Sequence, residues 1–263
     1  MNFNSKVYAF SGLIIAALLI ILGIGYFAAK HAEIPAVTPA SSEATTTSIQ
    51  GGGYTIEQIP LSQSTMPDLD HQITFDASVP SDVRTILQND VTETAARLKK
   101  DPTNAADWFN LGIYYHEADD FNAAAQVWVF LTKVVAPPGN AVALENLGKL
   151  YALDLKDFPK AESYFNQAIA ADSSTIDPYM ELYQLYLYSY KQNTSAAVDT
   201  LNRAAAAFPS DYSAYLVLGG YYSDKGDTAD ARIALNKAMD RARAAGDVNA
   251  MASIGAQLAK LPQ

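Results

Sequence analysis

The pattern of apolar and polar residues divides the chain into three parts, and the first is an unbroken apolar run. Residues 7–29, "VYAFSGLIIAALLIILGIGYFAA", contain no charged side chain. A helix over these residues would be roughly 34 Å long, enough to cross a bilayer core of about 30 Å. The pattern therefore predicts a transmembrane anchor over residues 1–30. The alternative is a cleaved signal peptide, which would have an apolar region of about 7–15 residues and a small-residue cleavage site.

The second part, residues 31–80, shows neither helical nor strand periodicity. It opens with "AEIPAVTPASSEATTTSIQGGG", which is rich in Ala, Ser, Thr, Pro and Gly and contains too few apolar residues to build a core. Scattered apolar residues return over residues 54–80, among several prolines. We expect a flexible or extended linker, with residues 54–80 lying extended against the part that follows.

The third part, residues 81–263, has the periodicity of amphipathic helices and repeats itself. "WFNLGIYYHEADDFNAAAQVW" and "YLVLGGYYSDKGDTADARIAL" share one spacing of large residue, Leu-Gly, Tyr, Ala and large residue. The glycines, Gly112 and Gly219, are expected where two helices cross so closely that a Cβ would hold them apart. Ala124 and Ala231 are expected to be the small partners on the facing helix.

Further copies of this spacing lie between and after these two. "LENLGKLYALDLKDFPKAESYFNQAIAAD" places Gly148 and Ala161 in the same positions, with one extra residue in the turn. Another copy fills the spacing with Met180, Tyr183, Gln184 and Leu187, followed by Ala197 and again a turn one residue longer. "MASIGAQL" is expected to be a fifth first helix that caps the array.

These motifs resemble the tetratricopeptide repeat (TPR), a unit of about 34 residues that forms two antiparallel helices. The resemblance implies an all-α fold, a right-handed superhelical solenoid of helix-turn-helix repeats, preceded by the transmembrane helix and the linker. The expected units are a partial repeat over 81–101, repeats over 105–138, 141–174, 177–210 and 212–245, and a capping helix over 247–261.

The stretch "PYMELYQLYLYSY", residues 178–190, is too short for a second membrane span and carries Glu181. On a helix, its tyrosines at 179, 183, 186 and 190 form one stripe, which we interpret as core rather than as an aromatic ligand pocket. Leu185 and Tyr188 are expected on the opposite side of the helix, with Tyr188 on the concave side of the solenoid.

The charge balance bears on the partner. Eighteen basic residues stand against 28 acidic ones, a formal charge of −10, and residues 31–263 hold all 28 acids with 16 of the bases, a net of −12. An acidic surface repels phosphate backbones, so nucleic-acid binding is not expected. The absence of cysteine excludes disulfides and thiolate chemistry.

No set of residues predicts catalysis, a cofactor or a metal site. The three histidines, His31, His71 and His116, are scattered. The acids of "DKGDTAD", residues 224–230, lack the closing glutamate of a calcium loop and are expected to cap the turn instead. We therefore expect a protein that is not an enzyme.

The family binds peptides or protein segments on the concave wall made by the first helices. The wall residues implied by the resemblance are Phe109, Asn110, Ile113, His116, Glu145, Asn146, Lys149, Glu181, Leu185, Tyr188, Leu216 and Gly220. Only Lys149 is basic, whereas repeats that clamp a peptide's carboxylate use several basic residues. An acidic wall favours a neutral or basic, partly apolar segment.

The layout is similar to that of bacterial single-pass TPR proteins. We therefore expect a single-pass protein of the bacterial cytoplasmic membrane, in contact with lipid through residues 7–29 and with its repeats on the extracytoplasmic side. Its expected function is a scaffold that binds a partner segment in the concave groove during envelope complex assembly. The alternatives are a chaperone-like holder of unfolded extracytoplasmic clients and self-association through the ends of the solenoid; the sequence does not specify the oligomeric state.

Overall fold

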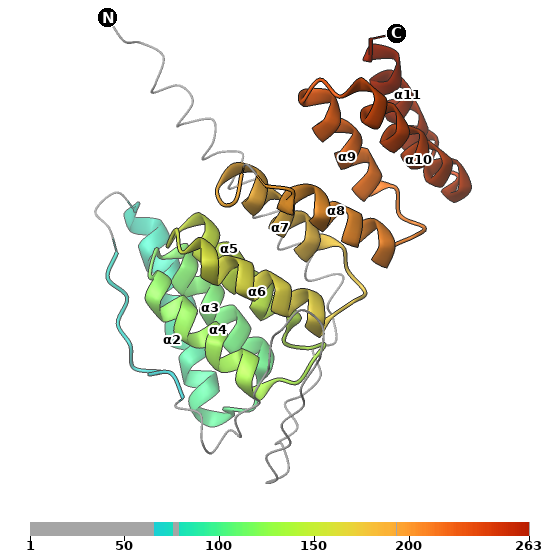
Figure 1. Ribbon diagram of the computed structural model, residues 1–263. Coiled ribbons are helices and arrows are strands. Elements are labelled where there is room, and N and C mark those ends of the chain that lie inside the picture. Colours follow the sequence, from blue (N-terminus) through green and yellow to red (C-terminus); the bar gives the residue numbers. More distant parts are fainter. Residues whose placement is uncertain (1–65, 76–78, 193, 263) are drawn as a thin grey trace, which may run out of the picture. The chain divides into compact units, whose positions relative to one another are not determined.

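The computed structural model describes residues 66–75, 79–192 and 194–262, and over these residues the regular secondary structure is all α-helix, without a strand. The all-α prediction is therefore confirmed for this part of the chain. The helices run in the order α2 (Ser81–Lys100), α3 (Ala105–Glu117), α4 (Phe121–Val134), α5 (Ala141–Leu153), α6 (Phe158–Ala171), α7 (Asp177–Tyr188), α8 (Ala196–Ala207), α9 (Ser213–Asp224), α10 (Thr228–Ala245) and α11 (Val248–Lys260) (Figure 1).

The predicted transmembrane anchor over residues 7–29 lies outside the described residues, as does most of the predicted linker. Among the helices from α2 to α11, none is both long enough and apolar enough to cross a membrane.

Short polar residues begin many of the helices. Five helices carry an Asn or Asp at the N-cap whose side chain accepts a hydrogen bond from the backbone N–H three residues later. The five caps are Asn104, Asp120, Asp157, Asp227 and Asp247. The capping role predicted for the acids of the last repeat turn is confirmed for Asp227, whose Oδ1 accepts from the Asp230 N–H at 3.1 Å.

The helices pack as consecutive neighbours. Each helix from α2 to α11 contacts the next along the chain, and short turns join the pairs α3–α4, α5–α6 and α9–α10 (Figure 1). The pair α7–α8 is joined by a longer turn. Such stacking of each unit on its neighbours is how repeat arrays bury a continuous core.

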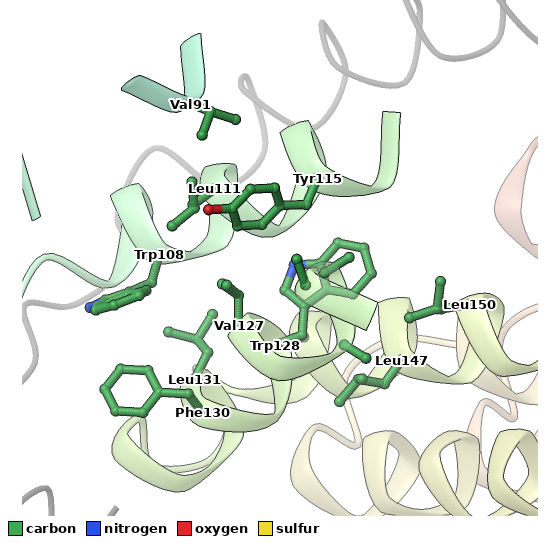
Figure 2. Packing of buried hydrophobic residues seen from close by; sticks show 14 of the residues in the cluster. Val91, Trp108, Leu111, Tyr115, Val127, Trp128, Phe130, Leu131, Leu147 and Leu150 are labelled. Carbon is green, nitrogen blue, oxygen red and sulfur yellow. The ribbon is translucent and has the colours of Figure 1, made fainter. Parts of the chain in front are cut away.

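The core is a series of clusters whose side chains change in size along the chain. Around α2 to α5 it is built on large residues, with Trp108, Tyr115 and Trp128 at most 3 % exposed (Figure 2). Between α10 and α11 three of the six buried residues are alanines, and the others are Leu235, Ile254 and Leu261. The first cluster therefore buries much larger side chains than the last.

Three glycines allow close crossing between the two helices of a repeat, as predicted. A Cβ at any of these glycines would overlap a large side chain of the following helix. The three pairs are Gly112 with Trp128, Gly148 with Phe165, and Gly219 with Leu235. In each pair the large residue lies four positions after Ala124, Ala161 or Ala231, and these three alanines are 0 % exposed on the facing helix.

The third repeat differs from its predicted register. Tyr179, Leu182, Tyr183 and Tyr186 are buried, whereas Gln184, aligned with the glycines, is exposed. The spacing therefore begins one residue earlier than predicted, with Tyr183 at the glycine position, and the turn after Tyr186 is two residues longer than in the first repeat rather than one. The buried tyrosine stripe is confirmed at 179, 183 and 186.

Residues 66–75, which precede the helices, are held against them. Ile73 is 8 % exposed, and Leu69 and Phe75 pack on the first core cluster. Lys99 Nζ lies 2.5 Å from Asp70 Oδ1. His71 Nε2 lies 2.6 Å from Asp120 Oδ2. This part of the predicted linker is thus bonded to α2 and to the start of α4.

Candidate protein-binding surface

The twelve predicted wall residues come from α3, α5, α7 and α9, the first helices of the four repeats. Nine of them are half-buried: Phe109, Asn110, Ile113, His116, Asn146, Lys149, Glu181, Leu216 and Gly220. Glu145 is 8 % exposed and Tyr188 is 70 % exposed. We call the partly or fully exposed side of these four helices the first-helix face.

Leu185 does not belong to this face. Its side chain is 4 % exposed and packs in the second core cluster with Leu182 and Tyr186. The prediction placed it opposite the tyrosine stripe, but α7 contacts α5, α6 and α8, and Leu185 lies on the side of α7 that packs into the core. Leu185 is therefore a core residue and cannot contact a partner.

The corrected register of the third repeat brings in residues that the sequence analysis missed. Counting from Tyr179 as from Trp108, the positions of Phe109, Asn110, Ile113 and His116 are taken by Met180, Glu181, Gln184 and Leu187. Met180 and Leu187 are half-buried, and Gln184 is exposed. The spacing of Tyr179 and Leu182, equal to that of Trp108 and Leu111, was the signal in the sequence that could have found them.

A charged cluster joins the second and third repeats at this face. Lys149 Nζ lies 2.6 Å from Glu145 Oε1 on its own helix and 3.4 Å from Glu181 Oε1 on α7. The predicted residues Glu145, Lys149 and Glu181 are thus brought together in space. With two carboxylates and one ammonium group, the cluster carries one excess negative charge when all three are ionised.

Burial and mutual attraction act on these groups in opposite directions. Burial alone would lower the pKa of Lys149, but the attraction of Glu145 and Glu181 outweighs it, and the pKa of Lys149 lies above its ordinary value. Burial raises the pKa of Glu181, with Lys149 opposing the shift. The lysine is therefore held charged, while the environment of Glu181 disfavours its charge.

His116 is engaged by the chain itself. Its Nε2 lies 3.0 Å from Asp154 Oδ2 at the end of α5, and its ring lies 5.5 Å from that of Phe121 and 5.9 Å from that of Trp128. The contact with Asp154 connects the first repeat with the second, and the ring contacts with Phe121 and Trp128 lie within the first repeat. His116 thus lies on the first-helix face, as predicted, but its ring is engaged in contacts within the chain.

Two large apolar side chains stand exposed where α5 and α7 end. Leu153 is 64 % exposed and Tyr188 is 70 % exposed, and their helices contact each other. Leu153 was not predicted, although it lies one turn after Lys149. Over residues 66–75, 79–192 and 194–262, no group of three or more His, Asp or Glu could hold a metal ion.

The chain matches a known protein family over two segments. Residues 109–175 and 184–247 match the family model of the tetratricopeptide repeat. No curated protein matches the chain.

Solved structures resemble the chain with TM-scores below 0.5. "Crystal structure of MamA" is 21 % identical over 66 % of this chain and 99 % of its own, with a TM-score of 0.47. "Crystal structure of MamA protein" is 26 % identical over 58 % and 80 %, with 0.40. "Crystal structure of PilW, widely conserved type IV pilus biogenesis factor" is 24 % identical over 67 % and 84 %, with 0.41. The family match identifies residues 109–175 and 184–247 as tetratricopeptide repeats, as the sequence pattern predicted.

Proposed function

We propose that this chain is a scaffold that binds a segment of a partner protein on the first-helix face. Residues 7–29 anchor it in the bacterial cytoplasmic membrane, and the repeats work on the extracytoplasmic side in the assembly of an envelope complex. The observation that carries the proposal is the cluster of Glu145, Lys149 and Glu181, where two repeats present polar groups together on a partly exposed face.

The chemistry of this face favours a polypeptide partner. Half-buried apolar residues such as Phe109 and Leu216 lie on the same helices as amides and carboxylates, a mixture that suits a peptide backbone with mixed side chains. The excess carboxylate at Glu181 and the net charge of −10 favour a neutral or basic segment over nucleic acid.

The test is a crosslinked pull-down with the full chain. The binding variant combines Lys149→Ala, Glu181→Ala and Tyr188→Ala. A matched control combines Lys100→Ala, Glu93→Ala and Ile233→Ala, which removes one lysine, one glutamate and one large apolar side chain, all exposed, from α2 and α10.

We expect the binding variant to lose the partner and the control to keep it, with equal helicity by circular dichroism. Partners that persist with the binding variant would rule out the first-helix face as their site. The anchor is checked separately: removing residues 1–30 should move the protein from the membrane fraction to the soluble fraction.

The second candidate is a chaperone-like holder of unfolded extracytoplasmic clients. It is favoured by the exposure of Leu153 and Tyr188, since exposed apolar side chains bind unfolded chains without sequence preference. A holder should suppress the aggregation of chemically denatured luciferase, whereas a scaffold should retain one stoichiometric partner and leave luciferase aggregation unchanged.

A further inference from the structure

A charged patch and an apolar patch follow one another along α5 and α7. The charged patch is the cluster of Glu145, Lys149 and Glu181, and the apolar patch is the pair Leu153 and Tyr188. Both helices are first helices of adjacent repeats. They run in the same direction, because the chain passes from α5 to α7 through α6, which runs antiparallel to both. The two patches therefore occupy the same relative positions on neighbouring helices.

Helical spacing places the patches on one side of each helix. On α5, Glu145, Lys149 and Leu153 follow at intervals of four residues, so they form one ridge. On α7, Glu181 and Tyr188 are seven residues apart, two turns along the same face. At about 1.5 Å rise per residue, the charged and apolar groups are separated by about 6 Å on α5 and about 10 Å on α7.

The exposure pattern supports this arrangement. Leu147 and Leu150, which lie between the ridge positions of α5 in sequence, are 0 % exposed, and so is Leu182 on α7. The other sides of both helices therefore pack into the core, while Leu153 and Tyr188 are 64 % and 70 % exposed to solvent. Large apolar side chains this exposed leave apolar surface that a partner can remove from water.

The charges of the charged patch determine which partner side chain is favoured beside it. Lys149 neutralises one of the two carboxylates, Glu145, at 2.6 Å, and lies farther from Glu181 at 3.4 Å. Glu181 keeps 30 % of its side chain exposed, and burial already disfavours its charge. A cation placed beside Glu181 would stabilise that carboxylate, while an acidic group would be repelled by it.

We propose, resting on the function proposed above, that α5 and α7 select a partner segment by the spacing of two of its side chains. A Lys or Arg of the segment faces Glu181, and a large apolar side chain covers Leu153 and Tyr188. A separation of about 10 Å corresponds to three residues of extended chain or seven residues of helix. The segment therefore carries a basic residue three or seven positions from a large apolar one.

The experiment selects peptides from a random phage-displayed library on the immobilised full chain in nonionic detergent. The enriched peptides are synthesised, labelled with fluorescein and titrated by anisotropy against the wild type, Glu181→Gln and Tyr188→Ala. The matched controls are Glu93→Gln, an exposed acid on α2, and Ile233→Ala, an apolar side chain that is 53 % exposed on α10.

We expect enriched peptides to share the basic and apolar pair at this spacing, and to bind each of the two variants about tenfold more weakly but the controls unchanged. Replacing the peptide's basic residue by Glu should abolish binding to the wild type. Glu181→Lys should restore binding of that acidic peptide, which a merely structural role of Glu181 would not do.

The outcomes separate this inference from the function on which it rests. Enriched peptides that lack the pair, yet lose binding in the Lys149, Glu181 and Tyr188 triple variant, would overturn the spacing and leave the binding face standing. Enriched peptides that bind the triple variant as well as the wild type would overturn both. A library that yields no peptide above background would also count against both.

Discussion

Two adjacent glycines of α9 offer a direct test of the close helix crossings. Replacing Gly by Ala inside a helix stabilises it by up to about 1 kcal/mol, because glycine loses more backbone freedom on folding. A Cβ at Gly220 meets nothing within 4 Å, so Gly220→Ala should keep this gain. A Cβ at Gly219 would lie 2.5 Å from Leu235 Cγ and 3.4 Å from the Leu235 backbone nitrogen.

Overpacking of this kind costs about 1–3 kcal/mol. Gly219→Ala should therefore be neutral to destabilising by about 2 kcal/mol, and the two variants should differ by about 1–3 kcal/mol. At about 2–4 °C per kcal/mol for a domain of this size, their melting temperatures should differ by several degrees. The assay is thermal and urea unfolding of the full chain, followed by circular dichroism at 222 nm.

A repeat array need not unfold in one step, so hydrogen exchange of α9 and α10 should accompany the melts. Faster exchange there in Gly219→Ala would locate the effect at the crossing. Adding Leu235→Ala should make the Gly219 substitution less costly, because the overlapping side chain is gone. Equal stability of Gly219→Ala and Gly220→Ala would refute the close crossing of α9 and α10.

Three further predictions concern stability elsewhere. Asp107 is 7 % exposed and accepts three hydrogen bonds from Arg97, so Asp107→Ala should lower the free energy of unfolding by about 1–3 kcal/mol in urea melts. Asp240→Ala, at an exposed ion pair, should lower it by almost nothing. Removing residues 247–263 should uncover the apolar side of α10 and cause aggregation or a lower melting temperature, seen by gel filtration and calorimetry, while Val248→Ser, at a side chain 70 % exposed, should not. Burial raises the pKa of three tyrosines in the folded protein from 10 to about 12. The stability gained by keeping them neutral is complete below pH 10 and is lost as pH rises through 12, and absorbance at 295 nm should show them ionising at higher pH in the folded than in the unfolded protein. These three are Tyr115, Tyr164 and Tyr183.

Much of the fold could be predicted because small and large residues recur at fixed spacing. A glycine followed by a tyrosine three positions later marks a helix crossing in three repeats, and each of those glycines lies under a large side chain of the next helix. The third repeat lacks this marker. With Tyr183 at the glycine position, several apolar registers fit the sequence, and the burial of Leu182 together with the exposure of Gln184 shows which one the chain adopts.

The candidate surface was predictable in part for a similar reason. Lys149 follows from the repeat register, but its pairing with Glu181 depends on how two repeats stack, which no local spacing specifies. Leu185 was misplaced because the register of its repeat was off by one residue. Leu153 was missed because an apolar residue at a helix end gives no signal of its own exposure.

The core contains tryptophan around α3 and α4 but mainly smaller side chains, with several alanines, around α10. This difference affects which part of the molecule unfolds locally first. A core of small side chains makes fewer dispersion contacts, so its helices open at lower free energy than those closed over large rings. Thermal fluctuation should thus release α10 and α11 before α3 and α4. The protein would then fray from its carboxyl end while the repeat nearest residues 66–75 stays closed.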